Sequence, residues 1–279
     1  MDILDIYEDV KKDVQAIYRS RLQAQMLLSL YDEDNNTLAR LREVTGSTSQ
    51  ALLPKIRILE SNKLIESVEH EYRLTPLGKI VASRVADSVM TMGTVLEHKE
   101  FWKSHYMEAI PQPLLESIGS LYDSKIVSDT NVEIFNVYHH FLDMIKKADH
   151  IYGITAIMSS GHADILGERI QEGIPVKLIV TKSVIEELRQ QPYIEQIHQL
   201  QKLPNFQVFM VDNDINLGFT VTDKCLSLGL YKSDGITYKS DGITYDTTTD
   251  LFSYDENAIK WGENLFKYYL HDAVELNLT

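Results

Sequence analysis

The chain has 279 residues, of which 44% are hydrophobic and 24% charged, a composition typical of a packed protein with one or two domains. Its one cysteine, Cys225, excludes an internal disulfide and a cluster of thiolate metal ligands. No apolar run approaches the roughly 20 residues that cross a bilayer, and no segment resembles a signal peptide, so we expect a cytoplasmic protein without a membrane partner.

The formal net charge of −14 is unevenly distributed along the chain. Residues 19–87 carry ten Lys and Arg against nine acidic residues, whereas residues 88–279 carry fifteen against twenty-seven. An acidic protein repels a polyanion, but a near-neutral segment contacts phosphate if its basic residues share one face. Any nucleic-acid contact is therefore expected within residues 19–87.

Apolar residues recur at helical spacing three times between residues 19 and 60. The polar cluster at 32–36 ends the first helix, and the turn at 45–47 separates a short second helix from a third. Ser47 or Ser49 is the predicted N-cap of the third helix. The pattern therefore predicts helix, turn, helix.

Two strand-like runs follow, at 64–69 and 72–75, and predict a hairpin that turns at residues 70–71. Thr75 and Pro76 then predict the cap and first residue of another helix. Three helices followed by a hairpin resemble the winged helix-turn-helix of ArsR- and MarR-like transcription regulators, over roughly residues 18–90. The resemblance implies a third helix in the major groove of double-stranded DNA.

That resemblance also implies which residues contact DNA. They are Ser47, Thr48, Ser49, Gln50, Lys55, Arg57 and Arg73. A homodimer is expected, because a two-fold protein matches a palindromic site. The open alternative is a wing fold that contacts only protein, which the acidic wing tip at Glu69 and Glu71 favours.

Three domains are predicted: residues 1–90, a helical connector at 91–127, and an effector-sensing domain at 128–279. In the connector, Phe101, Trp102, Tyr106 and Met107 predict part of a dimer seam.

In the last domain helices alternate with strands, which predicts an α/β sheet, parallel at its start and antiparallel at its end. The strands are expected at 151–157, 176–180, 206–211, 217–223 and 225–231, with helices up to residue 147 and at 163–171, 184–202 and 257–270. Ser253 and Glu256 predict a capping box for the last helix.

Several stretches of the chain share a second likeness. The segments LLPKIRILESNKLI, EFWKSHYMEAIPQPLL, GIPVKLIVT and YDTTTDLFSYDENAIKWGENLFKYY together resemble the archaeal FilR-like regulators of methanogens. The likeness implies a DNA-binding transcription regulator with a middle domain that senses a small molecule. That middle domain is in turn similar to one half of a phospholipase-D-like fold, which makes the expected fold class α+β with several domains.

An effector site is predicted at the carboxyl ends of the first two core strands, where open α/β sheets bind ligands. Hydroxyl groups and free backbone donors at helix N-termini suit an anionic small molecule there. The predicted residues are Thr155, Ser159, Ser160, His162, Thr181, Lys182 and Ser183. Ordinary helix capping by Ser and Thr is the open alternative.

Catalytic motifs are absent from the sequence. There is no His-x-Lys pair of the phospholipase type, no G-x-S-x-G, no P-loop and no dinucleotide-binding glycine fingerprint. Neither a metal nor a cofactor is predicted, because His139 and His140 point about 100° apart on a helix. Cys225 is expected to be a small core residue. The alternative to a regulator is a degenerate hydrolase or nucleotide-binding enzyme with a partner-binding winged helix.

The unit YKSDGIT occurs twice in succession, at 231–237 and 238–244. Each Asp-Gly pair favours a type I′ hairpin turn. Two identical copies indicate a tandem duplication without function, which would lengthen a surface hairpin or add a strand at 236–240. One carboxylate per seven residues is too few for Ca²⁺, which takes six to eight oxygens.

Overall fold

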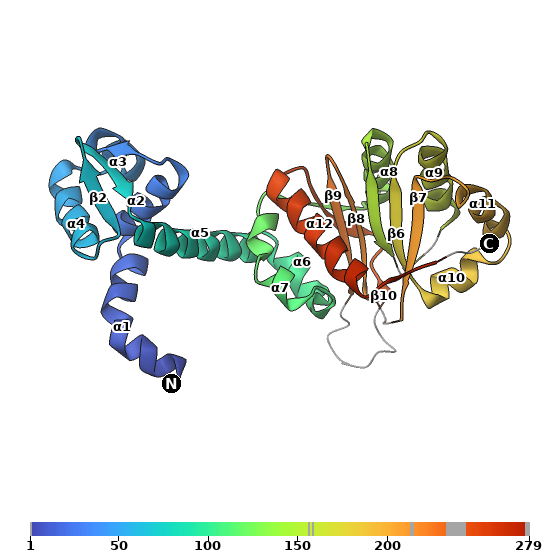
Figure 1. The fold of residues 1–279 in the computed structure, drawn as a ribbon, viewed down its shortest axis with the longest axis horizontal. Coiled ribbons are helices and arrows are strands. Elements are labelled where there is room, and N and C mark those ends of the chain that lie inside the picture. Colours follow the sequence, from blue (N-terminus) through green and yellow to red (C-terminus); the bar gives the residue numbers. More distant parts are fainter. Residues whose placement is uncertain (1, 156, 158, 213–214, 233–243, 277–279) are drawn as a thin grey trace. The chain divides into compact units, whose positions relative to one another are not determined.

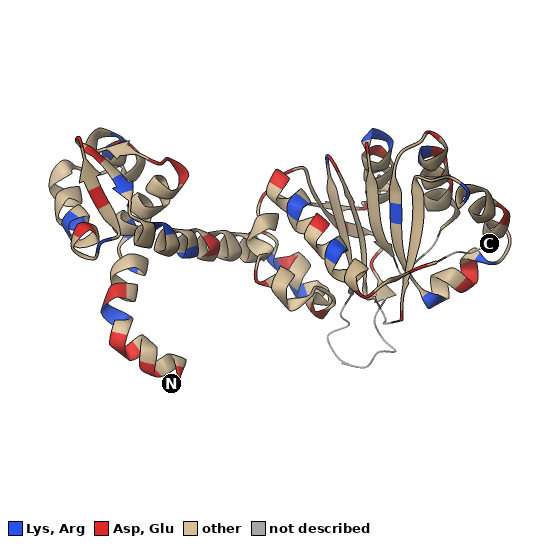
Figure 2. Ribbon diagram, viewed as in Figure 1, with Lys and Arg blue, Asp and Glu red and all other residues tan. Residues whose placement is uncertain are grey.

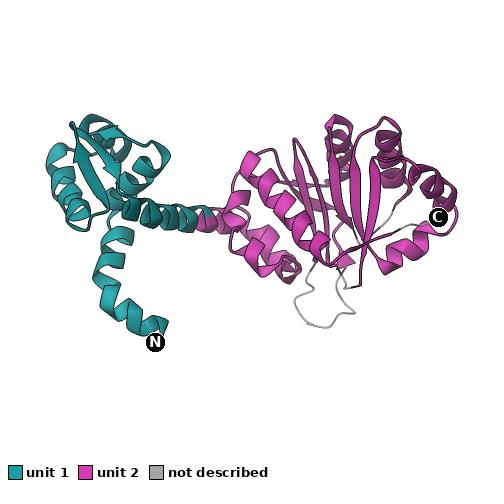
Figure 3. Ribbon diagram, viewed as in Figure 1, with its two compact units in different colours: residues 1–90 teal, residues 91–279 magenta. Residues whose placement is uncertain are grey.

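The computed structural model describes residues 2–155, 157, 159–212, 215–232 and 244–276. The chain forms two compact units, Met1–Met90 and Thr91–Thr279 (Figure 3). Most of the duplicated YKSDGIT stretch falls at 233–243, outside the described residues, so its turns and extra strand stay predictions. Acidic and basic residues are interspersed over both units (Figure 2).

The first unit has the predicted order of elements (Figure 1). Its elements are α1 (Ile3–Tyr18), α2 (Arg21–Asp32), β1 (Asn36–Thr37), α3 (Leu38–Thr45), α4 (Ser49–Ser61), β2 (Ile65–Val68), β3 (Glu71–Leu74) and α5 (Pro76–Glu97), the last of which continues into the second unit. The strands form a sheet of order β1-β3-β2 with antiparallel pairing. Helix α1 was not predicted.

The hairpin β2–β3 turns one residue earlier than predicted. Glu69 and His70 occupy the turn with φ of 51° and 70°, which is the backbone conformation of a type I′ turn. The cap of α5 is as predicted, because Thr75 Oγ1 accepts a hydrogen bond from the backbone N–H of Gly78 at 3.0 Å. The hairpin and α5 are therefore joined by a tight, capped connection.

The second unit is built on one large sheet. Its strand order is β12-β7-β6-β5-β8-β9-β11-β4, with β10 paired to β9. The strands are β4 (Lys125–Ser128), β5 (Ile151–Thr155), β6 (Val176–Thr181), β7 (Phe206–Val211), β8 (Leu217–Thr222), β9 (Leu226–Lys232), β10 (Thr244–Tyr245), β11 (Thr249–Ser253) and β12 (Val274–Glu275). Strands β5, β6 and β7 are parallel and the remaining pairs are antiparallel, which confirms the predicted mixture.

Helices cover both faces of this sheet (Figure 1). One face packs on α12 (Glu256–His271) together with α6 (Lys99–Ser104), α7 (Gln112–Leu115) and the short 3-10 helices η1 (Met107–Ala109) and η2 (Ile118–Leu121). The other face packs on α8 (Asn136–Lys147), α9 (Ser160–Gln171), α10 (Lys182–Leu188) and α11 (Tyr193–Leu200). Among the described helices, none combines the length and apolar character that a bilayer span requires.

The aromatic cluster that predicted a dimer seam lies inside the second unit. Phe101 and Trp102 are only 5% and 9% exposed, and Tyr106 and Met107 pack against the same core. The Trp102 indole donates to the carbonyl of Thr94 at 2.9 Å. The prediction of a seam here is wrong, because these side chains cover a face of the unit's own sheet.

Two local predictions in the second unit are also wrong. The N-cap of α12 is Asp255, whose Oδ1 accepts from the N–H groups of Asn257 and Ala258, whereas Ser253 ends strand β11. The single helix expected at 184–202 is two helices, α10 and α11. The first correction arises from tertiary pairing, since β11 is held between β9 and β4. The second has a local cause, because Pro192 lies between α10 and α11 and proline interrupts helical hydrogen bonding.

Candidate nucleic-acid interface

Helix α4 is anchored by one apolar face. Leu52, Ile56 and Leu59 are buried in the core of the first unit, where they meet residues of α2 and the hairpin. Residues i, i+4 and i+7 of a helix share a face, so the spacing of these three fixes which side of α4 is turned outward. The opposite side is free to contact a partner.

Gln50, Pro54, Arg57 and Ser61 occupy that outer side, and all four are exposed. Glutamine and arginine are side chains that pair bidentately with adenine and guanine edges in the major groove. Among the described residues Arg57 makes no ion pair, so its guanidinium is available to a partner. The predicted residues Gln50 and Arg57 thus lie together on one face.

The turn before α4 holds the other predicted residues of the helix. Gly46 ends α3 in the left-handed conformation with φ 61°. Thr48, rather than the predicted Ser47 or Ser49, is the N-cap, and its hydroxyl accepts from the N–H of Ala51 at 3.4 Å. Ser47 and Ser49 are half-buried, which leaves Thr48 as the exposed hydroxyl of the three.

The basic residues of the first unit differ in whether they are already paired. Lys55 flanks the outer face of α4, half-buried, and forms no ion pair among the described residues. Arg73 on β3 is paired with Glu66 on β2, with Nε and Oε1 2.7 Å apart. Arg40 bridges Glu33 and Glu43, which raise its pKa further. Arg73 is therefore placed less favourably for phosphate than Arg57.

The predicted effector residues are brought to one edge of the second sheet, but their polar groups are largely used within the chain. Ser159 caps α9, and its hydroxyl lies 2.6 Å from His162 Nδ1. Thr181 Oγ1 and Ser183 Oγ are 2.9 Å apart. Burial lowers the pKa of His162, which packs against the ring of Phe141. Ser159 thus acts as a helix cap, whereas the side chain of Thr181 makes no capping hydrogen bond to α10.

The remaining predicted residues at this edge are Thr155, Ser160 and Lys182. Thr155 Oγ1 donates to the carbonyl of Ile157 at 2.7 Å, whereas Lys182 is exposed and forms no ion pair among the described residues. Ser160 is exposed at the first turn of α9. Lys182 and Ser160 are thus the two side chains of this set whose polar groups have no partner within the part of the chain that the structure describes.

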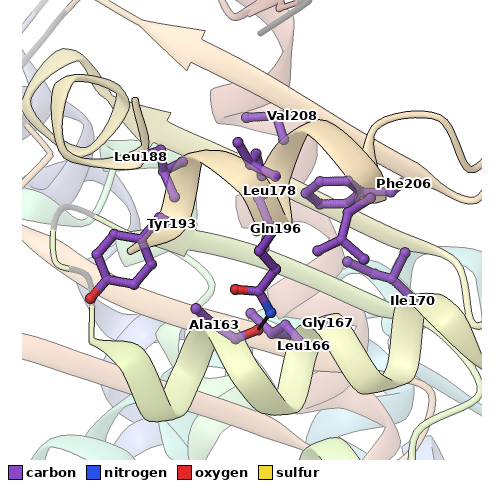
Figure 4. A pocket seen from close by; sticks show the side chains of 12 residues that line it. Ala163, Leu166, Gly167, Ile170, Leu178, Leu188, Tyr193, Gln196, Phe206 and Val208 are labelled. Carbon is purple, nitrogen blue, oxygen red and sulfur yellow. Dashed lines mark hydrogen bonds between the residues drawn. The ribbon is translucent and has the colours of Figure 1, made fainter. Parts of the chain in front are cut away.

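A cavity of about 40 Å³ lies beside that edge, between α9, α11 and strands β6 and β7 (Figure 4). Its walls are apolar, and the amide of Gln196 reaches across it to the carbonyl of Ala163 at 3.4 Å. Sites for small molecules in proteins occupy roughly 300–1,000 Å³. This cavity is therefore too small for a metabolite.

Cys225 lies immediately before β9 and is 1% exposed, which confirms that it is a core residue. Burial raises the pKa of its thiol to about 11. Because the thiolate is the reactive form, this cysteine is inert near neutral pH. Among the described residues no group of three His, Cys, Asp or Glu side chains is arranged to hold a metal ion.

One polar group was missed by the sequence analysis. His105 and Asp246, both 2% exposed at the side chain, approach to 3.2 Å between Nε2 and Oδ2, and Lys232 joins the same oxygen at 3.0 Å. His105 and Asp246 are 141 positions apart in the sequence. No local pattern could therefore predict that they meet. A second cavity adjoins this cluster.

Family models match two parts of the chain. Residues 11–92 match the model described as "Methanogenesis regulatory protein FilR1, N-terminal domain", and residues 134–272 match that of its middle domain. The chain is 28% identical over 273 residues to the methanogenesis regulatory protein FilR1 of Methanothrix harundinacea (strain 6Ac). The alignment covers 96% of this chain and 59% of that protein, so the chain spans well under two thirds of its relative's length.

Similar solved structures are distant. The archaeal chromatin protein TrmBL2 is similar over 94% of this chain and 97% of its own, with a TM-score of 0.43 and 17% identity. Nuc, a phospholipase D family member from Salmonella typhimurium, is similar over 55% of this chain and 97% of its own, with a TM-score of 0.39 and 9% identity. The family models and the curated relative confirm the predicted resemblance, and the chain belongs to the family of FilR1-like regulatory proteins.

Proposed function

We propose that the chain is a transcription regulator that binds double-stranded DNA through a winged helix in its first unit and senses a small molecule in its second. The observation that carries the proposal is the outer face of α4, where Gln50 and Arg57 are exposed on a helix whose other side is fixed in the core. In this proposal the protein acts in the cytoplasm and is not an enzyme.

The charge of residues 19–87, which contain the helices and hairpin of the winged helix, supports DNA over a protein partner. Residues 19–87 carry a net charge of +1 in a chain of −14. Arg57 and Lys55 are unpaired among the described residues, whereas the acidic hairpin residue Glu66 is neutralised by Arg73. That pair reduces the repulsion of Glu66 on a phosphate backbone, whereas Glu69 and Glu71 at the wing tip form no ion pair among the described residues.

Replacing Arg57 with alanine is expected to weaken DNA binding by about 1–3 kcal/mol, because a bidentate contact to a base contributes that much. Lys55→Ala is expected to reduce the slope of log affinity against log salt by about 0.9, as for one lost phosphate contact. The measurement is fluorescence anisotropy of the full chain on DNA from upstream of its own gene, over a range of salt concentrations.

Arg84→Ala is the matched control, because Arg84 is exposed on α5 and paired with Asp87. Its affinity should equal that of the wild type. Full affinity in both α4 variants would remove α4 as the reading helix. If the folded protein binds no DNA, the result favours the alternative, a winged helix that contacts only protein.

A homodimer remains part of the proposal, with α1 as its contact in place of the aromatic cluster. Ile3, Tyr7, Val10, Val14 and Ile17 follow one another at spacings of four and three residues, the seam of a two-stranded coiled coil. Ile3, Tyr7 and Val10 are 72%, 41% and 40% exposed. A second copy of the same helix would bury this stripe.

Val10→Glu should therefore dissociate the dimer, since a charge at the seam opposes its burial. The measurement is sedimentation equilibrium, with Lys12→Glu as a control that changes charge on the same exposed helix away from the stripe. A wild type that sediments as a monomer, or a Val10→Glu variant that stays dimeric, would exclude α1 as the contact.

For the second unit, the proposed effector residues are those at the ends of β5 and β6. Lys182 and Ser160 have the free polar groups of this set. An anionic ligand would gain the charge of Lys182 and the first backbone N–H groups of α9.

A further inference from the structure

We propose that Arg21 contacts a phosphate of the DNA backbone, with its guanidinium held in place by the turn that precedes α4. The inference rests on the proposed function and deepens it, because it adds a backbone contact to the helix proposed to read bases. Arg21 is the first residue of α2 and is exposed. It is not among the residues that the resemblance to winged helices implied as DNA contacts.

The position of Arg21 on α2 is unfavourable for a cation. The N-terminal end of a helix carries a partial positive charge, which favours acidic side chains in the first turn. Helix α2 has no acidic residue there. Its N-cap is Ser20, whose hydroxyl accepts from the N–H of Gln23 at 3.4 Å. The charge of Arg21 therefore does not stabilise α2 itself.

The guanidinium of Arg21 is held against the end of α3. Its Nη2 donates to the carbonyl of Thr45 at 3.0 Å, and its Nε donates to Gln25 Oε1 at 3.1 Å. Thr45 is the last residue of α3 and is 1% exposed, with its own hydroxyl donating to the carbonyl of Leu41 at 2.7 Å. The last carbonyls of a helix have no partner within it. The bond from Arg21 satisfies one of them, and two bonds from one planar group fix its orientation.

This guanidinium keeps its full positive charge, because both of its acceptors are neutral. Arg40, Arg73 and Arg84 of the same unit each lie within 3.3 Å of a carboxylate oxygen. Arg21 forms no such ion pair in the described part of the chain, and its Nη1 makes no hydrogen bond there. A guanidinium that is oriented by neutral oxygens and has N–H groups to spare matches a phosphate, which accepts hydrogen bonds from its planar fork.

Arg21 lies beside the start of the proposed reading helix. Gly46 follows Thr45 directly, and Thr48 is the N-cap of α4. Gln50 lies in the first turn of α4, with Arg57 about two turns further along. The major groove is about 12 Å wide and is bordered by the phosphates of both strands. A helix that lies in this groove therefore brings the turn at its N-terminal end to one backbone.

Fluorescence anisotropy of the full chain over a range of salt concentrations tests this contact, on upstream DNA and on random-sequence DNA. Arg21→Gln should weaken binding to both DNAs by about tenfold. It should also lower the slope of log affinity against log salt by about 0.9. Arg21→Lys keeps the charge and should keep the slope, with a smaller loss of affinity because an ammonium lacks the planar fork.

Lys12→Gln is the matched control, because Lys12 is an exposed cation on α1 without an ion pair among the described residues. It should change neither the affinity nor the slope. Thermal unfolding followed by circular dichroism separates the phosphate contact from a purely structural role at the end of α3. In a structural role, Arg21→Gln and Arg21→Lys would both lower the melting temperature and the affinity and leave the slope unchanged. That pattern, or an Arg21→Gln variant with wild-type affinity and slope, overturns the proposal.

The two DNAs distinguish this inference from the proposed function. A phosphate contact carries no sequence information, so Arg21→Gln should weaken both complexes equally, whereas Arg57→Ala should weaken the complex with upstream DNA more. A loss in Arg21→Gln that is confined to upstream DNA would overturn the backbone contact. If the wild type binds no DNA, the proposed function fails as well. If binding depends on Arg57 but not on Arg21, the function stands and the phosphate contact falls.

Discussion

Gly78→Ala is expected to destabilise the first unit by about 3 kcal/mol or more, although alanine is the better helix former by about 1 kcal/mol. Gly78 lies in the first turn of α5, and a Cβ there would stand 1.7 Å from the carbonyl oxygen of Leu64 and 2.7 Å from its carbon. These are backbone atoms at the base of the hairpin. The same oxygen accepts the N–H of Thr75 at 3.0 Å, so it cannot retreat without breaking that bond.

The measurement is thermal unfolding followed by two signals. Far-UV circular dichroism reports both units, whereas tryptophan fluorescence reports only the second, because Trp102 and Trp261 both lie there. The dichroism transition of the first unit should shift down while fluorescence stays unchanged. Gly46→Ala is the control for backbone strain alone: φ is 61° and no atom lies within 4 Å, so about 1 kcal/mol is expected. Equal effects of the two substitutions would contradict the clash.

Asp250→Asn is expected to stabilise the second unit at pH 8 by up to about 4 kcal/mol. Asp250 is buried on β11, where Oδ2 accepts from Ser227 at 3.1 Å and Oδ1 has no partner among the described residues. Burial raises the pKa of Asp250 to about 7, and the nearby carboxylates of Asp246 and Asp129 add to the effect. An amide keeps the bond from Ser227 without ionising.

The raised pKa of Asp250 determines how the stability of the second unit changes with pH. An unfolded aspartate has a pKa of about 3.9, so the folded state binds this proton more tightly. The contribution of Asp250 to stability is fully present below about pH 4, is lost as pH rises to about 7, and stays lost above. The advantage of Asp250→Asn should therefore grow between those values and disappear at low pH.

Urea unfolding followed by tryptophan fluorescence at pH 5 and pH 8 measures that difference. Asp246→Asn is the matched control, because hydrogen bonds and Lys232 lower the pKa of Asp246 despite its burial. That variant should be less stable than the wild type at pH 8, the opposite sign. An Asp250→Asn variant that is less stable than the wild type at pH 8 would contradict a buried carboxyl with a raised pKa.

Local patterns predicted most of the elements of the first unit. Helical spacing in α2 and α4, the turn at Gly46 and the cap at Thr75 all act within a few residues, so they can be inferred without knowing the fold. The N-cap of α4 was missed by one position, because the stretch from Ser47 to Ser49 offers three adjacent hydroxyl side chains. Helix α1 was missed although its sequence carries a signal, because its apolar residues recur at spacings of four and three.

The prediction of the second unit succeeded where its strands are long. It failed where strands pair with segments that are distant in the sequence. Strand β4 has four residues and pairs with β11, with Ser128 opposite Thr249. Such short runs carry no alternation of their own. The pair His105 and Asp246 likewise depends on a remote contact, across 141 positions of the sequence. The aromatic residues of α6 were assigned to a dimer seam because the face of the sheet that they cover cannot be seen from their own segment.

The central claim is that the outer face of α4 reads bases in the major groove. Dimethyl sulfate footprinting on DNA upstream of the protein's own gene tests it most directly, because this reagent modifies guanine N7, which faces that groove. We expect wild-type protein to protect guanines in two half-sites about one helical turn apart, and Arg57→Ala to lose that protection at protein concentrations that still retain the DNA. Bound DNA whose guanines are modified as in free DNA, or a footprint unchanged by Arg57→Ala, would contradict it.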